Sequence, residues 1–148
     1  QEALDLRGKA AIANAQLAFE LFEERFSGPR WEALAKRGAR VQRPLWASTS
    51  TKNPAYPDTL YIDSLIGPNT VNTIPEATIE AFEDHGTVAR TVDSGISDPR
   101  EVLDGLARVG IDLTDVTDTL EHEGVQAFSR SLEDLFSTLS AKAAALNV

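Results

Sequence analysis

Four hydroxyl side chains and one lysine form the densest group of chemically active residues in this sequence. They make up the run Ser48-Thr49-Ser50-Thr51-Lys52, which Asn53 follows. The run comes directly after Leu45-Trp46-Ala47, which is typical of a short buried strand. Hydroxyl donors beside one ammonium group suit a phosphate dianion, but a polar loop with a solvated lysine has the same pattern. The residues by themselves leave both interpretations open.

Most other kinds of chemistry are excluded or disfavoured. The chain has no cysteine, so it forms no disulfide and uses no thiol. Its two histidines, His85 and His122, stand far apart and outside any metal-ligand spacing, so we expect no metal site. Lys52 could act as a Schiff-base nucleophile only in a desolvated setting or beside another cation. The hydroxyl run before it and the prolines Pro54 and Pro57 after it indicate a wetter setting.

The charge of the chain argues against nucleic acid as a partner. With 23 acidic and 14 basic residues, its formal net charge is -9, which repels a phosphate backbone. No apolar run approaches the ~20 residues that span a bilayer, and no signal peptide is visible, so we expect a cytoplasmic protein. Some basic residues fall within one stretch that forms either a solvated face or, in part, the partner of an anionic ligand: Arg25, Arg30, Lys36, Arg37, Arg40, Arg43 and Lys52.

Hydrophobic periodicity and turn residues predict an order of elements. We expect one amphipathic helix over 4–26 and a short helix over 30–38. A short strand within 41–51, a helix over 60–66 and a second strand over 70–74 follow. Pro75 opens a helix that closes at His85-Gly86, and residues 87–97 are expected to be extended or irregular. Two further helices are predicted, over 98–110 and from residue 114 onward.

The same periodicity predicts which side chains face a core. The expected inward residues are Leu6, Ala10, Ala13, Leu17, Leu21, Phe22, Phe26, Trp31, Leu34, Trp46, Val102, Leu103, Leu106 and Val109. The last helix carries a separate apolar stripe at helical spacing, formed by Val125, Phe128, Leu132, Leu135, Phe136 and Leu139.

A strand followed by a helix, twice over, is the βα unit of a parallel sheet. In such sheets the C-terminal ends of the strands carry the binding groups, and the hydroxyl run lies at that end of the first strand. Two strands cannot close a barrel, since a complete (β/α)8 barrel takes about 250 residues. The sequence has no methionine, so Gln1 is either a processed end or the edge of a fragment.

Two long motifs resemble the transaldolase family, especially its actinobacterial members. Residues 42–53, QRPLWASTSTKN, are similar to strand seven of that barrel and its loop. Residues 59–75, TLYIDSLIGPNTVNTIP, are similar to the next helix and strand eight. Residues 123–128 are similar to the start of the last helix, and the opening helix is similar to the one after strand six. The resemblance implies that 1–148 is a single segment, the C-terminal part of a (β/α)8 TIM barrel, helix-rich with two short parallel strands and C-terminal helices.

The resemblance also implies a function. Transaldolases are transferases of the pentose phosphate pathway that move a dihydroxyacetone unit from a ketose phosphate to an aldose phosphate, without metal or cofactor. Their Schiff-base lysine lies on strand four, so no catalytic residue is expected in this chain. The family pattern of Ser, any residue, a basic residue and Asn matches Ser50, Lys52 and Asn53. It implies that Ser50 and Lys52 contact the substrate phosphate.

Three further residues are candidates for lining the site: Asn53, Asn72 and Thr73. Strand alternation lets only one of Asn72 and Thr73 face the barrel interior. Many relatives have Arg in place of Lys52, and Lys offers a point charge rather than a bidentate fork. The strand-six phosphate ligand precedes Gln1, so we expect this chain to be inactive by itself and to pair with the missing N-terminal part of the barrel. Two alternatives stay open: a non-catalytic phosphate-binding module, and another Schiff-base aldolase.

Overall fold

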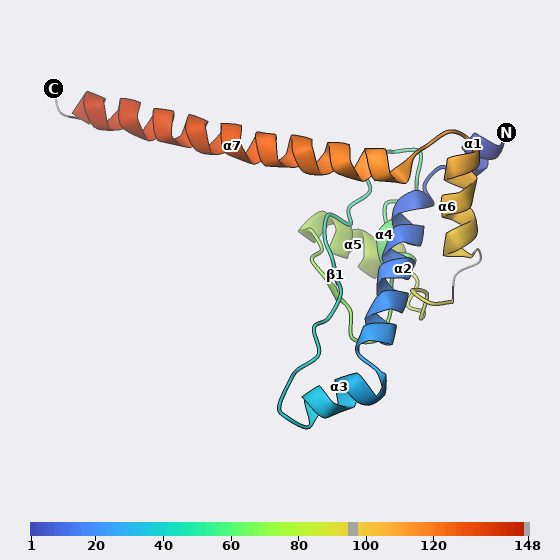
Figure 1. Cartoon of the computed structure of the whole chain (residues 1–148). Helices are drawn as coiled ribbons and strands as arrows, with labels where there is room; N and C mark the ends of the chain where they lie inside the picture. Colours follow the sequence, from blue (N-terminus) through green and yellow to red (C-terminus); the bar gives the residue numbers. More distant parts are fainter. Residues whose placement is uncertain (95–97, 147–148) are drawn as a thin grey trace. The chain divides into compact units, whose positions relative to one another are not determined.

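The computed structural model describes residues 1–94 and 98–146 (Figure 1). The chain divides into two units, Gln1–Val109 and Gly110–Val148. The first unit contains both strands, and the second contains one long helix. The expectation of an extended or irregular segment is confirmed for 87–94, which holds turns and bends, while 95–97 lie outside the described residues.

The first helical segment is broken by a glycine. α1 covers Glu2–Asp5 and α2 covers Ala10–Arg25, so the prediction of one continuous helix over 4–26 is wrong at its start. Gly8, between them, has φ +77°, a left-handed conformation that interrupts an α-helix. The ring of Tyr56 packs beside it, and a Cβ placed on Gly8 would lie 3.6 Å from that ring. The break therefore brings a loop from later in the sequence against the start of α2.

The buried face of α2 follows the predicted one in part. Ala13 is buried and Leu17, Phe22 and Phe26 are half-buried, as expected, but Leu21 is exposed. The most deeply buried side chain of the helix is Phe19, at 1% exposure, which the predicted stripe did not include. Phe19 begins a ladder of tilted rings, with centroids 5.9 Å apart from Phe19 to Phe22 and 5.3 Å apart from Phe22 to Phe26. Phe19 belongs to the buried cluster of the first unit, and Phe22 packs against that cluster.

The next helix begins earlier and ends earlier than predicted. α3 covers Gly28–Ala35, so Pro29 lies in the first turn of this helix rather than ending the one before it. The chain leaves the helix where Gly38 adopts φ +93°. Trp31 is half-buried, while Leu34 is exposed rather than inward.

Two short strands form a parallel pair, as predicted. β1 covers Leu45–Trp46 and β2 covers Val71–Asn72, with Leu45 opposite Val71 and Trp46 opposite Asn72. Both strands are shorter than the predicted segments. A parallel pair with a helix after each strand is consistent with part of a barrel. The assignment to strands seven and eight stays a prediction.

A cluster of four buried side chains joins β1 to the helices. It consists of Phe19, Trp46, Leu65 and Val92. The indole N–H of Trp46 donates a hydrogen bond to the carbonyl of Leu65 at 3.1 Å. Leu65 follows α4, which covers Leu60–Asp63 and is shorter than the helix predicted over 60–66. Trp46 is therefore a core residue, as expected.

α5 and α6 complete the first unit. α5 covers Glu76–His85, and Pro75 is the residue before it rather than its first residue. α6 covers Pro99–Arg108 and lies beside α2 (Figure 1). Its start is capped by Asp98, whose carboxylate accepts the N–H of Arg100 at 2.8 Å.

The predicted core face of α6 is confirmed at its centre, where Val102 and Leu106 are buried. Leu103 and Val109 are half-buried. Two ion pairs flank this face at 2.8 Å each, from Arg100 to Glu20 and from Arg108 to Glu2. All four of the paired side chains are largely exposed, so apolar packing rather than these pairs stabilises the contact.

The second unit is the single helix α7, which covers Leu113–Leu146. It begins one residue before the predicted start, and Asp112 accepts the N–H of Thr114 at 2.9 Å. The apolar stripe predicted along it is present but exposed, with Phe128 at 82%. Among the described residues, no helix is both long and apolar enough to cross a bilayer.

At Gly67 the core leaves no room for a side chain. A Cβ placed there would overlap the Cγ1 methyl of Val92 and lie 3.1 Å from its Cβ. We expect Gly67→Ala to destabilise the first unit by about 1–3 kcal/mol, because Val92 cannot move without opening the core. Guanidinium unfolding followed by tryptophan fluorescence measures this effect, since Trp31 and Trp46 both lie in the first unit.

Gly124→Ala is the matched control for this substitution. A Cβ on Gly124 meets no atom within 4 Å, and the residue lies in α7. The midpoint of the unfolding transition followed by tryptophan fluorescence should therefore be the same as in the wild type. An unchanged midpoint in Gly67→Ala would contradict the close packing of Val92.

Candidate functional site

The hydroxyl run leaves the C-terminal end of β1 through a left-handed turn. Ser48 has φ +57°, which is uncommon for a residue with a side chain. After this turn Thr49 is 4% exposed, and its hydroxyl donates to Oδ1 of Asn72 at 2.8 Å. The end of β2 thus anchors the first half of the run.

A cavity of about 430 Å³ lies beside this loop. Residues 48–53 supply most of the polar side chains of its wall, and β1 and α2 supply much of the rest. Its volume is within the usual range for small-molecule sites, about 300–1,000 Å³. A ligand that enters it would meet hydroxyl groups and one lysine.

Ser50 and Lys52, the two predicted phosphate contacts, come together in the structure. Both line the cavity, and Nζ of Lys52 donates a hydrogen bond to Oγ of Ser50. The Lys52 side chain is exposed and Ser50 is half-buried. An ammonium group and a hydroxyl that converge in this way can act on the same anion. Their contact with a phosphate stays a prediction.

Asn53 lines the cavity and also shapes the loop. Its Oδ1 accepts the N–H of Ala55 at 2.9 Å, and its carbonyl accepts the N–H of Tyr56 at 3.1 Å. This is an Asx turn, in which a side-chain amide replaces a backbone partner. The turn bends the chain so that Tyr56 returns to the cavity wall.

Asn72 and Thr73 are not part of the cavity wall that the described residues form. Asn72 accepts the hydroxyl of Thr49, as given above, and Thr73 donates its N–H to the carbonyl of Trp46 at 3.1 Å. Their role as site-lining residues stays a prediction.

Five of the described lining residues were not predicted from the sequence: Ala11, Ala15, Tyr56, Tyr61 and Leu65. Ala11 and Ala15 stand four residues apart, so their spacing could have indicated one small-residue face on the helix. The two tyrosines gave no comparable signal. Tyr56 lines the cavity because the turn at Asn53 bends the loop back and because Gly8 leaves room for the ring. Neither feature has a periodic sequence pattern.

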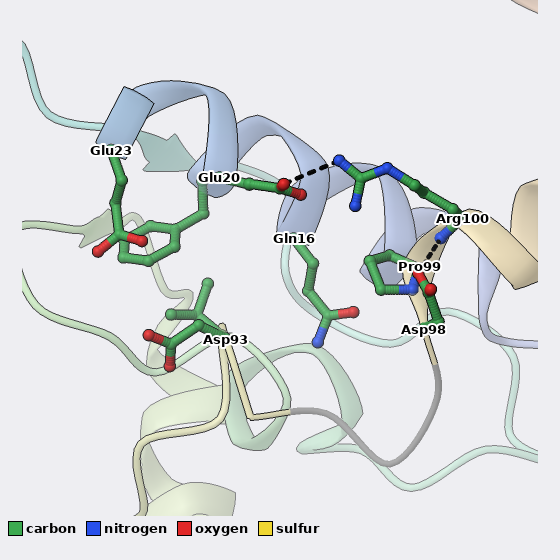
Figure 2. Close-up of a pocket in the computed structure, with 9 residues that line it drawn as sticks. Gln16, Glu20, Glu23, Asp93, Asp98, Pro99 and Arg100 are labelled. Atoms are coloured by element: carbon green, nitrogen blue, oxygen red, sulfur yellow. Dashed lines mark hydrogen bonds and ion pairs between the residues drawn. The ribbon is translucent and has the colours of Figure 1, made fainter. Parts of the chain in front are cut away.

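A second cavity, of about 280 Å³, lies between α2 and the start of α6 (Figure 2). Figure 2 shows the carboxylates of Glu20, Glu23 and Asp93 on its wall, with Asp98 at its other end. Arg100, the cation in its described wall, is already paired with Glu20 at 2.8 Å. A phosphate dianion would meet mainly negative charge here, so the cavity beside Lys52 is the better candidate.

The basic stretch between residues 25 and 52 contributes one residue to the candidate site. Of its members, Lys52 lines the loop cavity within the described wall, while Arg30, Lys36, Arg37 and Arg40 are exposed. A solvated basic face therefore accounts for most of the stretch. The described ranges, 1–94 and 98–146, hold no group of three His, Asp or Glu side chains placed to bind a metal ion.

Comparison with known proteins identifies the family. Residues 1–139 match the sequence profile described as transaldolase/fructose-6-phosphate aldolase. The chain belongs to this family. It is 54% identical over 140 residues to a transaldolase of Acidothermus cellulolyticus, covering 94% of this chain and 38% of that protein. It is 58% identical over 135 residues to a transaldolase of a Parafrankia species, covering 90% and 37%.

A third transaldolase, from Thermobifida fusca, is 51% identical over 146 residues, which cover 98% of this chain and 40% of that protein. The chain thus spans about two fifths of the length of these transaldolases. The resemblance carried by residues 42–53 and 59–75 is confirmed. The family implies a TIM barrel, and the two parallel strands with their helices fit part of one.

The Thr49–Asn72 hydrogen bond gives a testable stability difference. Thr49→Val removes the donor but keeps the shape, so the amide oxygen of Asn72 loses its protein partner. We expect a loss of about 0.5–1.5 kcal/mol, the usual net contribution of one hydrogen bond, because Asn72 is half-buried rather than buried. Unfolding curves followed by tryptophan fluorescence measure this loss.

Thr49→Ser provides the control because it retains the hydroxyl. It should recover most of the stability, apart from the contribution of one methyl group. Equal losses in the Val and Ser variants would show that the hydroxyl contributes nothing.

Proposed function

We propose that this chain provides the substrate-phosphate contacts of a transaldolase, an enzyme that transfers a dihydroxyacetone unit between a ketose phosphate and an aldose phosphate through a Schiff base. The observation that carries the proposal is the Ser50–Lys52 pair, which lines a cavity at the end of a parallel strand in a member of this family. The reaction belongs to the pentose phosphate pathway, and the proposed location is the cytoplasm.

The chemistry of the pair supports a phosphate ligand. The Lys52 ammonium group supplies a compact positive charge, and the Ser50 hydroxyl supplies a further donor on the same wall. Charge-assisted hydrogen bonds of this kind are stronger than neutral ones. Because an ammonium group acts as a point charge, Lys52 lacks the rigid planar fork with which a guanidinium group would bind two phosphate oxygens.

The proposal places the carbonyl chemistry outside this chain. In the family resemblance the Schiff-base lysine lies on strand four, and the chain matches about two fifths of the length of its relatives. Asn53 forms the Asx turn that bends the loop, and Asn72 accepts the hydrogen bond of Thr49 at the start of the loop. The remainder of the barrel is the partner that this chain requires for turnover.

Phosphate binding by Lys52 can be tested on the chain itself. We expect Lys52→Gln to weaken the binding of inorganic phosphate roughly tenfold, because one charge-assisted hydrogen bond is lost. Titration of ¹⁵N-labelled protein, followed by NMR at the amides of residues 48–53, measures the change. Lys36→Gln, at the exposed end of α3, is the control and should bind as the wild type does. Equal affinities in the two variants would contradict the proposed contact.

Schiff-base formation tests the placement of the nucleophile. Incubation of the chain with fructose 6-phosphate and borohydride should give no covalent adduct, because Lys52 lies on an exposed loop among hydroxyl groups. Adduct formation should appear when the N-terminal segment of the Thermobifida fusca transaldolase is supplied and associates with the chain. An adduct on the chain alone, mapped to Lys52 by mass spectrometry and absent from Lys52→Gln, would show that the nucleophile is here.

A further inference from the structure

His85 stands at the C-terminal end of α5, far from Lys52 in sequence, yet it contacts the turn that closes the loop carrying Ser50 and Lys52. Its Nε2 lies 2.8 Å from Oδ1 of Asp58, and its Nδ1 lies 3.0 Å from Oδ2 of Asp84. Asp58 is at the end of the loop, just before α4. Both ring nitrogens of one histidine therefore face carboxylate oxygens.

This geometry constrains the protonation state of the ring. An ionised carboxylate can only accept hydrogen bonds, and a neutral imidazole has a single N–H to donate. Both contacts are hydrogen bonds at the same time only when the ring is an imidazolium. When His85 loses its proton, one of the two carboxylates loses its donor.

Asp58 connects His85 to the loop through its backbone. The hydroxyl of Thr51, which stands between Ser50 and Lys52, donates to the carbonyl of Asp58 at 3.2 Å. A second hydrogen bond joins the chain after α5 to α4, and it does not depend on the protonation state of His85. In it, the N–H of Thr87 donates to Oδ1 of Asp63 at 2.8 Å. Loss of the His85–Asp58 bond would therefore loosen one end of the loop without releasing α5.

We propose that His85 is a positioning residue for the phosphate loop: as the imidazolium it holds Asp58, and through Thr51 it fixes the loop in the conformation that places Ser50 and Lys52 in the cavity. The inference rests on the proposed function, since it concerns the same phosphate contacts. It adds a residue that the family pattern over 50–53 does not contain. His85 does not touch the ligand.

The electrostatics of the pair agree with this assignment. The titratable groups that face the ring in the described structure are Asp58, from the turn before α4, and Asp84, from α5 itself. The hydrogen bond to Asp58, followed by the one to Asp84, raises the pKa of His85 above its ordinary value. The hydrogen bond from His85 lowers the pKa of Asp58. Both side chains are largely exposed, so the effect is a local adjustment of the loop.

The sign of the pH dependence follows from the raised pKa. The two simultaneous contacts are fully present below about pH 6.5, the ordinary pKa of histidine. As the pH rises through the higher pKa of the folded protein, one of them is lost, together with the positive charge that strengthens the other. Inorganic sulfate is a suitable probe, because it stays a dianion over this range whereas a sugar phosphate changes its own charge. We expect sulfate affinity to fall roughly two- to fivefold as His85 deprotonates, as for the loss of one exposed charged contact.

NMR of the full 148-residue chain tests the inference directly. Between pH 5 and 8.5, the amides of residues 49–53 should shift in one step whose midpoint matches that of the His85 ring protons. His85→Gln should abolish the step. His85→Lys, a cation that does not titrate in this range, should keep the loop amides near their low-pH positions throughout. His122→Gln, on α7, is the control and should retain the wild-type step.

Two results would overturn the inference: a step that persists in His85→Gln, or loop amides that do not shift while His85 titrates. If His85→Gln does not fold, His85→Lys decides, since a persisting step in that variant also contradicts the inference. A different result would show that the proposed function is wrong while this inference holds. Sulfate binding would then be absent or independent of Lys52, while the loop amides would still shift with the titration of His85.

Discussion

The hydrogen bond from the Trp46 indole to the carbonyl of Leu65 is the contact on which the first unit depends. Trp46 ends β1, and its side chain is buried with Phe19 and Val92. A buried indole N–H without a partner would be costly, so this bond and the packing around the ring reinforce each other. Together they fix the end of β1, and hence the point at which the hydroxyl run begins.

The loop that follows is held at both ends and open in the middle. At its start, Thr49 is buried and bonded to Asn72 on β2. At its end, Thr51 is bonded to Asp58, which His85 holds from α5. Ser50 lies between Thr49 and Thr51, Lys52 directly follows Thr51, and both line the cavity. Such an arrangement limits the conformational entropy that two flexible side chains would lose on binding an anion.

Charge distribution explains why one lysine can matter in an acidic protein. The net charge is -9, yet screening confines the effect of exposed charges to about 8–10 Å at physiological salt. The cavity beside Lys52 is lined by hydroxyl and apolar groups, whereas the carboxylate-rich cavity lies between α2 and α6. Of these two cavities, the one beside Lys52 has the lining better suited to the proposed anion, despite the overall charge.

The sequence alone determined the family, through the likeness carried by residues 42–53 and 59–75, and with it Ser50 and Lys52 as candidate phosphate contacts. It also predicted the parallel pair of strands and most of the helices. The strands and helices depend on short-range patterns: an apolar run before a hydroxyl run, proline and glycine at turns, and residues three or four apart on a helix. Tertiary structure decided the break at Gly8, the inward position of Phe19, and the contacts that Tyr56 and His85 make. Each of these depends on a contact between residues far apart in sequence, such as Gly8 with Tyr56 or His85 with Asp58. Periodicity carries no information about such contacts, because they are set by how the elements pack and where the loops return.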